Sequence, residues 1–175
     1  MDNGSAPTFE SLVERHSMEI YSYLWRMLRH TADAEDCLQE TFLRAFRAYP
    51  RLRVDSNPRA WLYKIATNTA KTSLARRSRR EASTGDLQEW GAEQHDDSAE
   101  VGERSQLLAT LMSLVQALPH KQRAALLLRK YQGLRYAEVA EIIHSTEEAA
   151  RANVYQALKR LRAEWRRQEE RYAPG

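Results

Sequence analysis

The chain has 175 residues, enough for one domain or two small ones, and its net charge of +3 is by itself too small to indicate a nucleic-acid partner. Its one cysteine, Cys37, excludes an intramolecular disulfide and a cysteine-based zinc site, and its five histidines lack the spacing of metal ligands. Because residues 1–10 do not resemble a secretory signal and no apolar run approaches the length of about 18 residues that spans a bilayer, we expect a cytoplasmic protein with no membrane insertion, metal or cofactor.

The charges are distributed unevenly along the chain. Residues 1–80 carry 14 basic and 9 acidic side chains, and residues 105–175 carry 12 basic and 7 acidic ones, a balance of +5 in each block. Residues 81–104 between them carry 8 acidic side chains and one arginine, with three glycines and few apolar residues. This pattern predicts two polyanion-binding modules joined by a flexible acidic linker.

The first block predicts three helices. Thr8 can cap the first, and Thr31 or Asp33 can cap the second, which Pro50 ends. Asn57 and Pro58 are typical of a helix start, as N-cap and first helical residue, and the third helix is expected to run to about Arg77. Its predicted buried residues are Leu62, Ile65, Ala66 and Thr69. Three such helices can share one small core.

The second of these helices has one apolar face and one charged face. The apolar stripe has the i, i+3, i+4 spacing of a buried helix face and consists of Ala34, Cys37, Leu38, Thr41, Phe42, Ala45, Phe46 and Tyr49. The other face carries charged and polar residues with Leu43 alone among them. An apolar residue surrounded by charges suits a docking surface, but an isolated exposed leucine on a solvated helix is equally common.

Residues 51–77 combine an aromatic residue with cations. Trp61, Lys64, Asn68 and Lys71 fall on one face of the predicted helix, and four arginines follow between residues 76 and 80. Such a face suits single-stranded DNA, whose bases stack on aromatic rings and whose phosphates need cations. A tryptophan at the start of an amphipathic helix is more often part of the core, and the polar residues can equally be a solvated face.

The second basic block predicts further helices that end in a helix-turn-helix. One helix, which ends at Pro119, is indicated by Leu107, Leu108, Leu111, Leu114 and Val115. Another runs from Ala124 to Tyr131 and is stopped by Gly133. A short helix over 136–143 and a longer basic helix follow, the latter opened by a capping box of Ser145 and Glu148. The outer surface of the last helix can contact base edges and phosphates through Arg151, Asn153, Tyr155, Gln156, Lys159 and Arg160.

The string DAEDCLQETFLRAF, from Asp33 to Phe46, resembles the polymerase-binding helix of bacterial sigma factors, called region 2.2. Residues 9–77 resemble sigma region 2 and residues 106–165 resemble sigma region 4, in the same order and with no domain between them. A two-part sigma factor of this size resembles the extracytoplasmic-function subgroup, group IV of the sigma-70 family. The resemblance implies an all-α fold with a region 2 domain at 1–80, an acidic linker at 81–104 and a region 4 domain at 105–175.

The resemblance also implies the sites. The polymerase-binding residues would be Asp36, Gln39, Glu40, Leu43 and Arg44. The −10 promoter strand would contact Arg53, Asp55, Ser56, Asn57, Arg59, Trp61, Lys64, Asn68, Lys71, Arg76 and Arg77, with the loop at 52–57 holding a flipped base. The −35 duplex would contact the six residues of the last helix named above. The chain departs from the usual region 4 pattern at His144, where glycine is common, and at 148–150, where Glu-Ala-Ala replaces Gly-Thr-Val.

Two other classes of protein compete with this interpretation. An enzyme is disfavoured because no glycine-rich phosphate loop, nucleophile elbow or paired-carboxylate site occurs, so we expect no catalytic residues. A conventional helix-turn-helix regulator with an N-terminal interaction domain would have no reason to carry DAEDCLQETFLRAF. The expected partners are therefore core RNA polymerase, promoter DNA and an anti-sigma factor that covers both DNA-facing surfaces.

Overall fold

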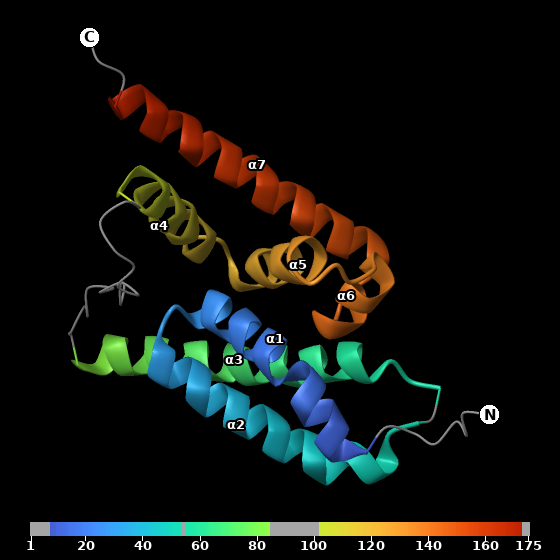
Figure 1. Cartoon of the computed structure of the whole chain (residues 1–175). Helices are drawn as coiled ribbons and strands as arrows, with labels where there is room; N and C mark the ends of the chain where they lie inside the picture. The colour runs from blue at the N-terminus through green and yellow to red at the C-terminus, as the bar shows by residue number, and fades with distance from the viewer. Residues whose placement is uncertain (1–7, 54, 85–101, 173–175) are drawn as a thin grey trace. The chain divides into compact units, whose positions relative to one another are not determined.

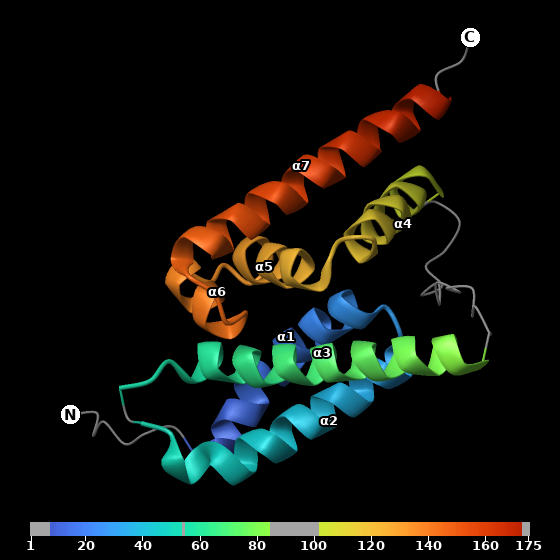
Figure 2. The same ribbon diagram turned by 180° about the vertical axis from the view of Figure 1, so that it is seen from behind.

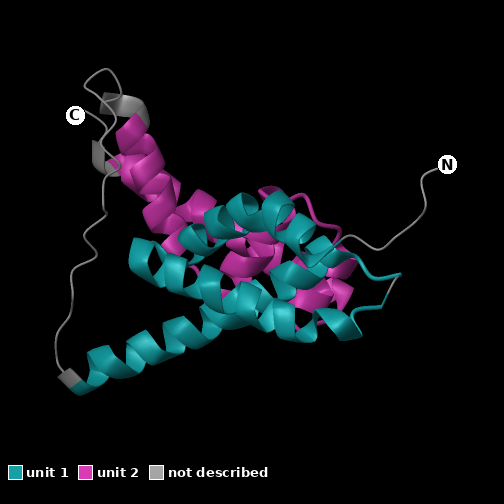
Figure 3. Cartoon of the chain, turned by 60° about the horizontal axis from the view of Figure 1, so that its bottom comes forward, with its two compact units in different colours: residues 1–91 teal, residues 92–175 magenta. Residues whose placement is uncertain are grey.

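The computed structural model describes residues 8–53, 55–84 and 102–172, which form seven α-helices and one short 3-10 helix. No strand occurs in these ranges, so the predicted all-α fold is confirmed. The chain divides into two compact units, residues 1–91 and 92–175 (Figure 3). None of the helices in the described part is long and apolar enough to cross a membrane.

Unit 1 is a three-helix bundle of α1 (Phe9–Leu28), α2 (Thr31–Ala48) and α3 (Pro58–Thr84), with the 3-10 helix η1 (Tyr49–Arg51) after α2. Each of the three helices packs against the other two (Figures 1 and 2). Large side chains of α1 fill the core, and α2 and α3 contribute mainly small ones. The fully enclosed residues include Ile20, Tyr23, Leu24 and Met27 from α1, Ala34 and Ala45 from α2, and Leu62, Ala66 and Ala70 from α3.

The predicted helix starts are right for α1 and α3 and wrong for α2. The Thr8 hydroxyl accepts a hydrogen bond from the Ser11 amide at 3.2 Å, and the Asn57 side chain accepts from the amides of Arg59 and Ala60 at 3.1 and 3.2 Å. The cap of α2 is His30, whose Nδ1 accepts from the Asp33 amide at 3.2 Å. Thr31 and Asp33 are already helical, so neither can occupy the extended backbone position that a cap requires.

Five predicted buried residues are less enclosed than expected, because Leu38, Phe42 and Tyr49 of the α2 stripe and Ile65 of α3 are half-buried and Phe46 is exposed. Phe46 lies on the predicted apolar face of α2, yet 60% of its surface is exposed. Its ring lies in a T-shaped arrangement with that of Phe9, the first residue of α1, at a centroid distance of 5.2 Å. On α3, Ile65 is half-buried, and the inner face is formed instead by Leu62, Tyr63 and Ala66.

Unit 2 consists of α4 (Gly102–Gln116), α5 (His120–Lys130), α6 (Tyr136–Ile142) and α7 (Glu147–Tyr172), with α7 in contact with the other three (Figure 1). Its core contains Leu127 and Leu128 of α5, Val139 and Ile142 of α6, and Val154 and Ala157 of α7. Gly133 follows α5 with φ of +68°, the left-handed conformation that stops a helix as predicted.

The helices on both sides of the predicted linker extend into it. Residues 81–84 continue α3, and residues 102–104 belong to α4. The third helix therefore runs past its expected end at Arg77. Residues 85–101, on which the rest of the linker prediction falls, lie outside the described residues.

The turn between α6 and α7 corrects the predicted capping box. The Thr146 hydroxyl accepts a hydrogen bond from the Ala149 amide at 3.1 Å, so Thr146 is the cap and the Ser145–Glu148 box is wrong. The helix begins one residue later than predicted, which puts Glu147 and Glu148 in its first turn, where carboxylates favour the positive end of the helix dipole. His144 has φ of +52°, which explains why glycine is common at this position.

The corrected cap predicts a difference between two neighbouring hydroxyls. Thr146→Ala should lower the free energy of unfolding by about 1 kcal/mol, because it leaves an amide in the first turn of α7 without its acceptor. Ser145→Ala is the matched control and should change the free energy of unfolding by only a few tenths of a kcal/mol, since its hydroxyl donates to the Thr146 carbonyl and, within the described residues, accepts from no amide of α7. Urea unfolding followed by circular dichroism measures both, and an equal loss in the two variants would restore the Ser145 cap.

Candidate functional site

The polar face of α2 points away from the core because the opposite stripe is buried. Ala34, Cys37, Thr41 and Ala45 form that stripe, and all of them are less than 5% exposed. Leu43 is 51% exposed, and Glu40 accepts a hydrogen bond from Arg44 Nε at 2.5 Å. The structure therefore places the five residues predicted to bind polymerase, Asp36, Gln39, Glu40, Leu43 and Arg44, on one continuous surface.

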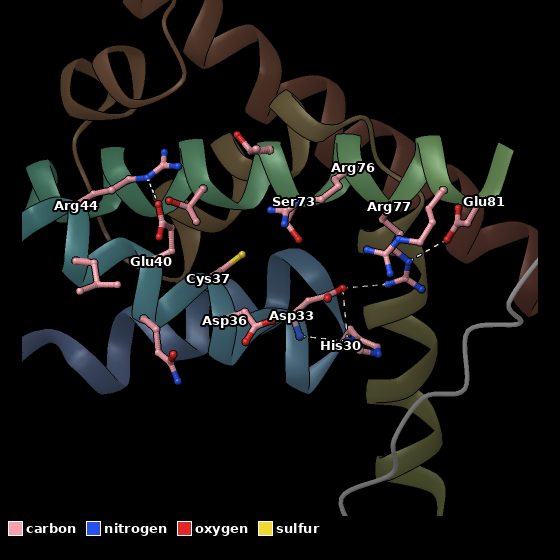
Figure 4. A pocket seen from close by; sticks show the side chains of 15 residues that line it. His30, Asp33, Asp36, Cys37, Glu40, Arg44, Ser73, Arg76, Arg77 and Glu81 are labelled. Carbon is pink, nitrogen blue, oxygen red and sulfur yellow. Dashed lines mark hydrogen bonds and ion pairs between the residues drawn. The ribbon is translucent and has the colours of Figure 1, made fainter. Parts of the chain in front are cut away.

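This surface forms one wall of a groove of about 730 Å³ between α2 and α3 (Figure 4). The α2 wall adds His30 and Asp33 to the five residues above. The α3 wall consists of Thr69, Thr72, Ser73, Arg76, Arg77, Arg80 and Glu81. Cys37 lines the floor with 4% exposure, and burial raises the pKa of its thiol, so it is a packing residue rather than a reactive thiolate. Periodicity indicated the α2 wall but not that α3 closes it into a groove.

The face of α3 carrying Trp61, Lys64, Asn68 and Lys71 lies outside the bundle core. Its residues alternate with the buried Leu62, Ala66 and Ala70, and are half-buried or, for Lys71, exposed. Trp61 is thus not one of the enclosed core residues. The four side chains form a row along one helix face, as their spacing predicted.

The loop before α3 is held by its own contacts. Arg53 donates two hydrogen bonds to the Asp55 carboxylate, both at 3.0 Å, and the Ser56 amide donates to the Arg53 carbonyl at 3.0 Å. Asn57 is the N-cap, so its carbonyl oxygen already accepts two backbone amides. Of these predicted DNA contacts, Arg53 and Asp55 are exposed, whereas Asn57 has a structural role.

Arg59 and Arg77 are also engaged within unit 1. Arg59 makes three hydrogen bonds of 2.8–3.1 Å to the Glu19 carboxylate on α1. The Arg77 side chain is only 18% exposed and lies 3.7 Å from Asp33 of α2 and 2.9 Å from Glu81. These two arginines, predicted as −10 contacts, therefore join α3 to α1 and to α2.

On α7, five of the six predicted −35 residues are exposed, namely Arg151, Tyr155, Gln156, Lys159 and Arg160. Asn153 is half-buried and donates its amide to the Ala149 carbonyl at 2.8 Å. Arg151 donates to Glu147 at 2.5 Å, and its guanidinium lies 4.4 Å from the centre of the Tyr136 ring on α6. Tyr136, which the sequence did not single out, thus orients Arg151 by a cation–π contact.

Both parts of the chain match known families. Residues 12–80 match Sigma-70 region 2, and residues 108–161 match Sigma-70, region 4. The RNA polymerase sigma-H factor of Pseudomonas aeruginosa is 31% identical over 169 residues, which cover 92% of this chain and 88% of that protein. The chain belongs to the extracytoplasmic-function sigma factors. The ECF RNA polymerase sigma-E factor of Escherichia coli K12 is likewise 31% identical, over 170 residues and with the same coverage.

A solved structure agrees with this assignment at the level of the fold. The sigma factor RpoE of Bartonella quintana, crystallised with the anti-sigma factor NepR, superposes with a TM-score of 0.74 at 21% identity, covering 89% of this chain and 94% of that one. The two family matches and the sigma-factor relatives show that the chain is an RNA polymerase sigma factor, which acts in transcription initiation and binds DNA. The alternative of a conventional helix-turn-helix regulator is not favoured, because the region 2 match covers nearly all of α1–α3.

A partly buried polar network joins α1 to the start of α3. His16 Nδ1 lies 2.5 Å from Glu19, which accepts the hydrogen bonds from Arg59 already described. Burial alone would raise the pKa of Glu19, but the hydrogen bonds from Arg59 and His16 and their charges together lower it below the ordinary value of 4.5. His16 and Glu19 show i, i+3 spacing in the sequence, but no local pattern links them to Arg59, 40 residues away.

The lowered pKa of Glu19 predicts a pH-dependent contribution to stability. A carboxylate whose folded pKa is depressed stabilises the fold above the unfolded value of 4.5, and this stabilisation is lost as pH falls through the folded value. Wild type should therefore be more stable than Glu19→Gln at neutral pH, and the difference should shrink below pH 4.5. Urea unfolding at several pH values measures it, with the exposed Glu14→Gln on the same helix as control. If the difference in stability between wild type and Glu19→Gln did not change with pH, ionised Glu19 would not be the stabilising group.

Proposed function

We propose that α2 docks this sigma factor on core RNA polymerase through Asp36, Gln39, Glu40, Leu43 and Arg44. The observation that carries this assignment is their gathering on one wall of the α2–α3 groove, within the helix that resembles region 2.2. Leu43 supplies apolar area, while Asp36 and Gln39 set the orientation of the partner by charge and hydrogen bonds.

The two DNA-facing surfaces divide the promoter between them in this proposal. The row of Trp61, Lys64, Asn68 and Lys71 on α3, with the loop at 52–57, holds the opened −10 strand by stacking and phosphate contacts. The exposed residues of α7 enter the major groove of the −35 duplex, with Arg151 and Gln156 as base readers and Lys159 and Arg160 on phosphates. The corresponding modules are residues 1–80 and 105–175, joined by the acidic segment 81–104.

In this proposal the protein carries out no covalent chemistry, because the family consists of non-catalytic initiation factors. It acts in the cytoplasm, where these factors meet RNA polymerase. We also propose an anti-sigma factor as its regulator. Two small basic modules on one tether can be clamped together by a single partner, because the second contact forms at high effective concentration. A stoichiometric protein that copurifies from the native host and prevents core binding would support this regulation, and a free, constitutively active protein would argue against it.

Docking through α2 predicts a loss of polymerase binding without a loss of folding. Leu43→Asp and Asp36→Lys should each weaken association with core polymerase by about 2 kcal/mol or more, because each places a wrong charge against a desolvated partner surface. Both side chains are exposed, so the helical circular dichroism and melting temperature should stay unchanged.

Glu35→Lys is the matched control for charge reversal on α2. Glu35 is exposed on the same helix but does not line the groove, so its reversal should leave the affinity for core polymerase within a factor of two or so of wild type. Titration of labelled protein with core polymerase measures all three variants. Wild-type affinity in folded Leu43→Asp and Asp36→Lys would rule out this docking face.

The proposed assignment of α7 to the −35 duplex and of α3 to the −10 strand predicts that variants on the two helices fail at different steps of initiation. Arg151→Ala and Gln156→Ala should weaken closed-complex formation on duplex promoter by about 1–3 kcal/mol per lost base contact. Lys64→Ala and Asn68→Ala should leave closed-complex affinity nearly unchanged and reduce the open complex. Asn57 is not a suitable alanine variant here, because its substitution would also remove the cap of α3.

Filter binding on duplex template measures the closed complex, and permanganate footprinting measures opening. A premelted −10 bubble should rescue the Lys64 and Asn68 variants only in part, since strand capture is lost together with melting. If these two variants bind duplex poorly and then open normally, the assignment of the two surfaces is reversed.

A further inference from the structure

The two walls of the α2–α3 groove have opposite charge. The α2 wall presents the carboxylates of Asp33, Asp36 and Glu40, and the α3 wall presents the guanidinium groups of Arg76 and Arg77 (Figure 4). Arg80 lines the α3 wall as well. With these signs nearly balanced, the groove has no strong preference for a small anion or a small cation. It is suited instead to a partner that carries both signs.

Part of this charge is neutralised within the groove. At the end near His30, Arg77 crosses from α3 to Asp33 on α2 at 3.7 Å and also pairs with Glu81 at 2.9 Å. Toward Leu43, Glu40 pairs with Arg44 on its own wall at 2.5 Å. Ion pairs therefore neutralise charges at both ends of the groove. In its middle, the charges of the two walls can interact with a partner.

Asp36 and Arg76 occupy that middle section on opposite walls, with Cys37 on the floor (Figure 4). Both side chains belong to exposed residues, and no ion pair within the described ranges involves either of them. An anionic and a cationic side chain thus line one groove without neutralising each other. The groove continues to Leu43, which is 51% exposed and offers an apolar anchor beside the charges.

We propose that this groove holds one segment of core polymerase that presents a cationic side chain to Asp36 and a carboxylate to Arg76. The proposal rests on the α2 docking face proposed above and extends it to α3. It reassigns Arg76, which the sequence placed among the −10 DNA contacts, to the polymerase interface. The two-signed walls fix the orientation of the segment, because a reversed segment would bring like charges together on both walls.

The test measures binding of the full chain to core polymerase in the absence of DNA, so that promoter contacts do not contribute. Arg76→Glu and Asp36→Arg should each weaken binding roughly tenfold or more, since each puts a like charge against its partner. Arg79→Glu is the matched control, because Arg79 is exposed on the same turn of α3 but does not line the groove, and it should bind as wild type does.

The double variant Asp36→Arg with Arg76→Glu separates contact with polymerase from contact between the two walls. If polymerase contacts Asp36 and Arg76 through separate side chains, exchanging the two charges makes both contacts repulsive. The double variant then loses more binding affinity than either single variant. If Asp36 and Arg76 act only on each other, the exchange preserves their attraction and restores binding, which would overturn the proposal.

The remaining outcomes distinguish this proposal from the docking face on which it rests. Wild-type core binding by Arg76→Glu, with binding lost in Leu43→Asp, would overturn the role of α3 and leave the α2 docking face intact. If Arg76→Glu, Leu43→Asp and Asp36→Arg all bind core polymerase as wild type does, the role of α3 and the α2 docking face are both overturned.

Two further outcomes would assign the groove differently. If the purified chain associates with itself and Arg76→Glu abolishes this association, a second copy of the chain occupies the groove. A defect of Arg76→Glu confined to promoter opening at saturating core polymerase would return Arg76 to the −10 strand.

Discussion

The close packing of α2 against α3 is the contact on which the functional surfaces of unit 1 depend. Ala34 and Ala45 on α2 and Ala66 and Ala70 on α3 are fully buried, and such short side chains let two helices approach closely. This packing fixes the rotation of both helices about their axes. The polar face of α2 and the cationic end of α3 consequently flank one groove instead of pointing in unrelated directions.

Several residues that a sigma factor is expected to use on DNA also hold this bundle together. Asn57 caps α3, Arg59 binds Glu19 on α1, and Arg77 binds Asp33 on α2. Their charge and hydrogen-bonding capacity are therefore largely used within the protein, so the proposed contacts with the strand fall mainly on the row along α3.

The helix-turn-helix of unit 2 is organised around its turn. His144 adopts a left-handed conformation that costs a non-glycine residue about 1 kcal/mol, and Thr146 follows as the cap of α7. Tyr136 at the start of α6 contacts Arg151 one turn into α7, so the short helix positions a side chain of the recognition helix. Glu147 holds the same arginine from its own helix, and the proposed contact with the −35 duplex would compete with this exposed pair, which contributes little to stability in water.

The sequence by itself determined the helical class, several helix boundaries and the faces that are turned outward, because periodicity and local caps act over a few residues. Leu43 on its polar face, Asn57 as a cap and Gly133 as a stop were all evident in this way. Only the tertiary structure decided the caps His30 and Thr146, since a shift of one residue depends on how each helix is seated in its core. It alone also decided the Glu19–Arg59 pair and the groove between α2 and α3, because these join residues tens of positions apart and no local pattern encodes such a contact.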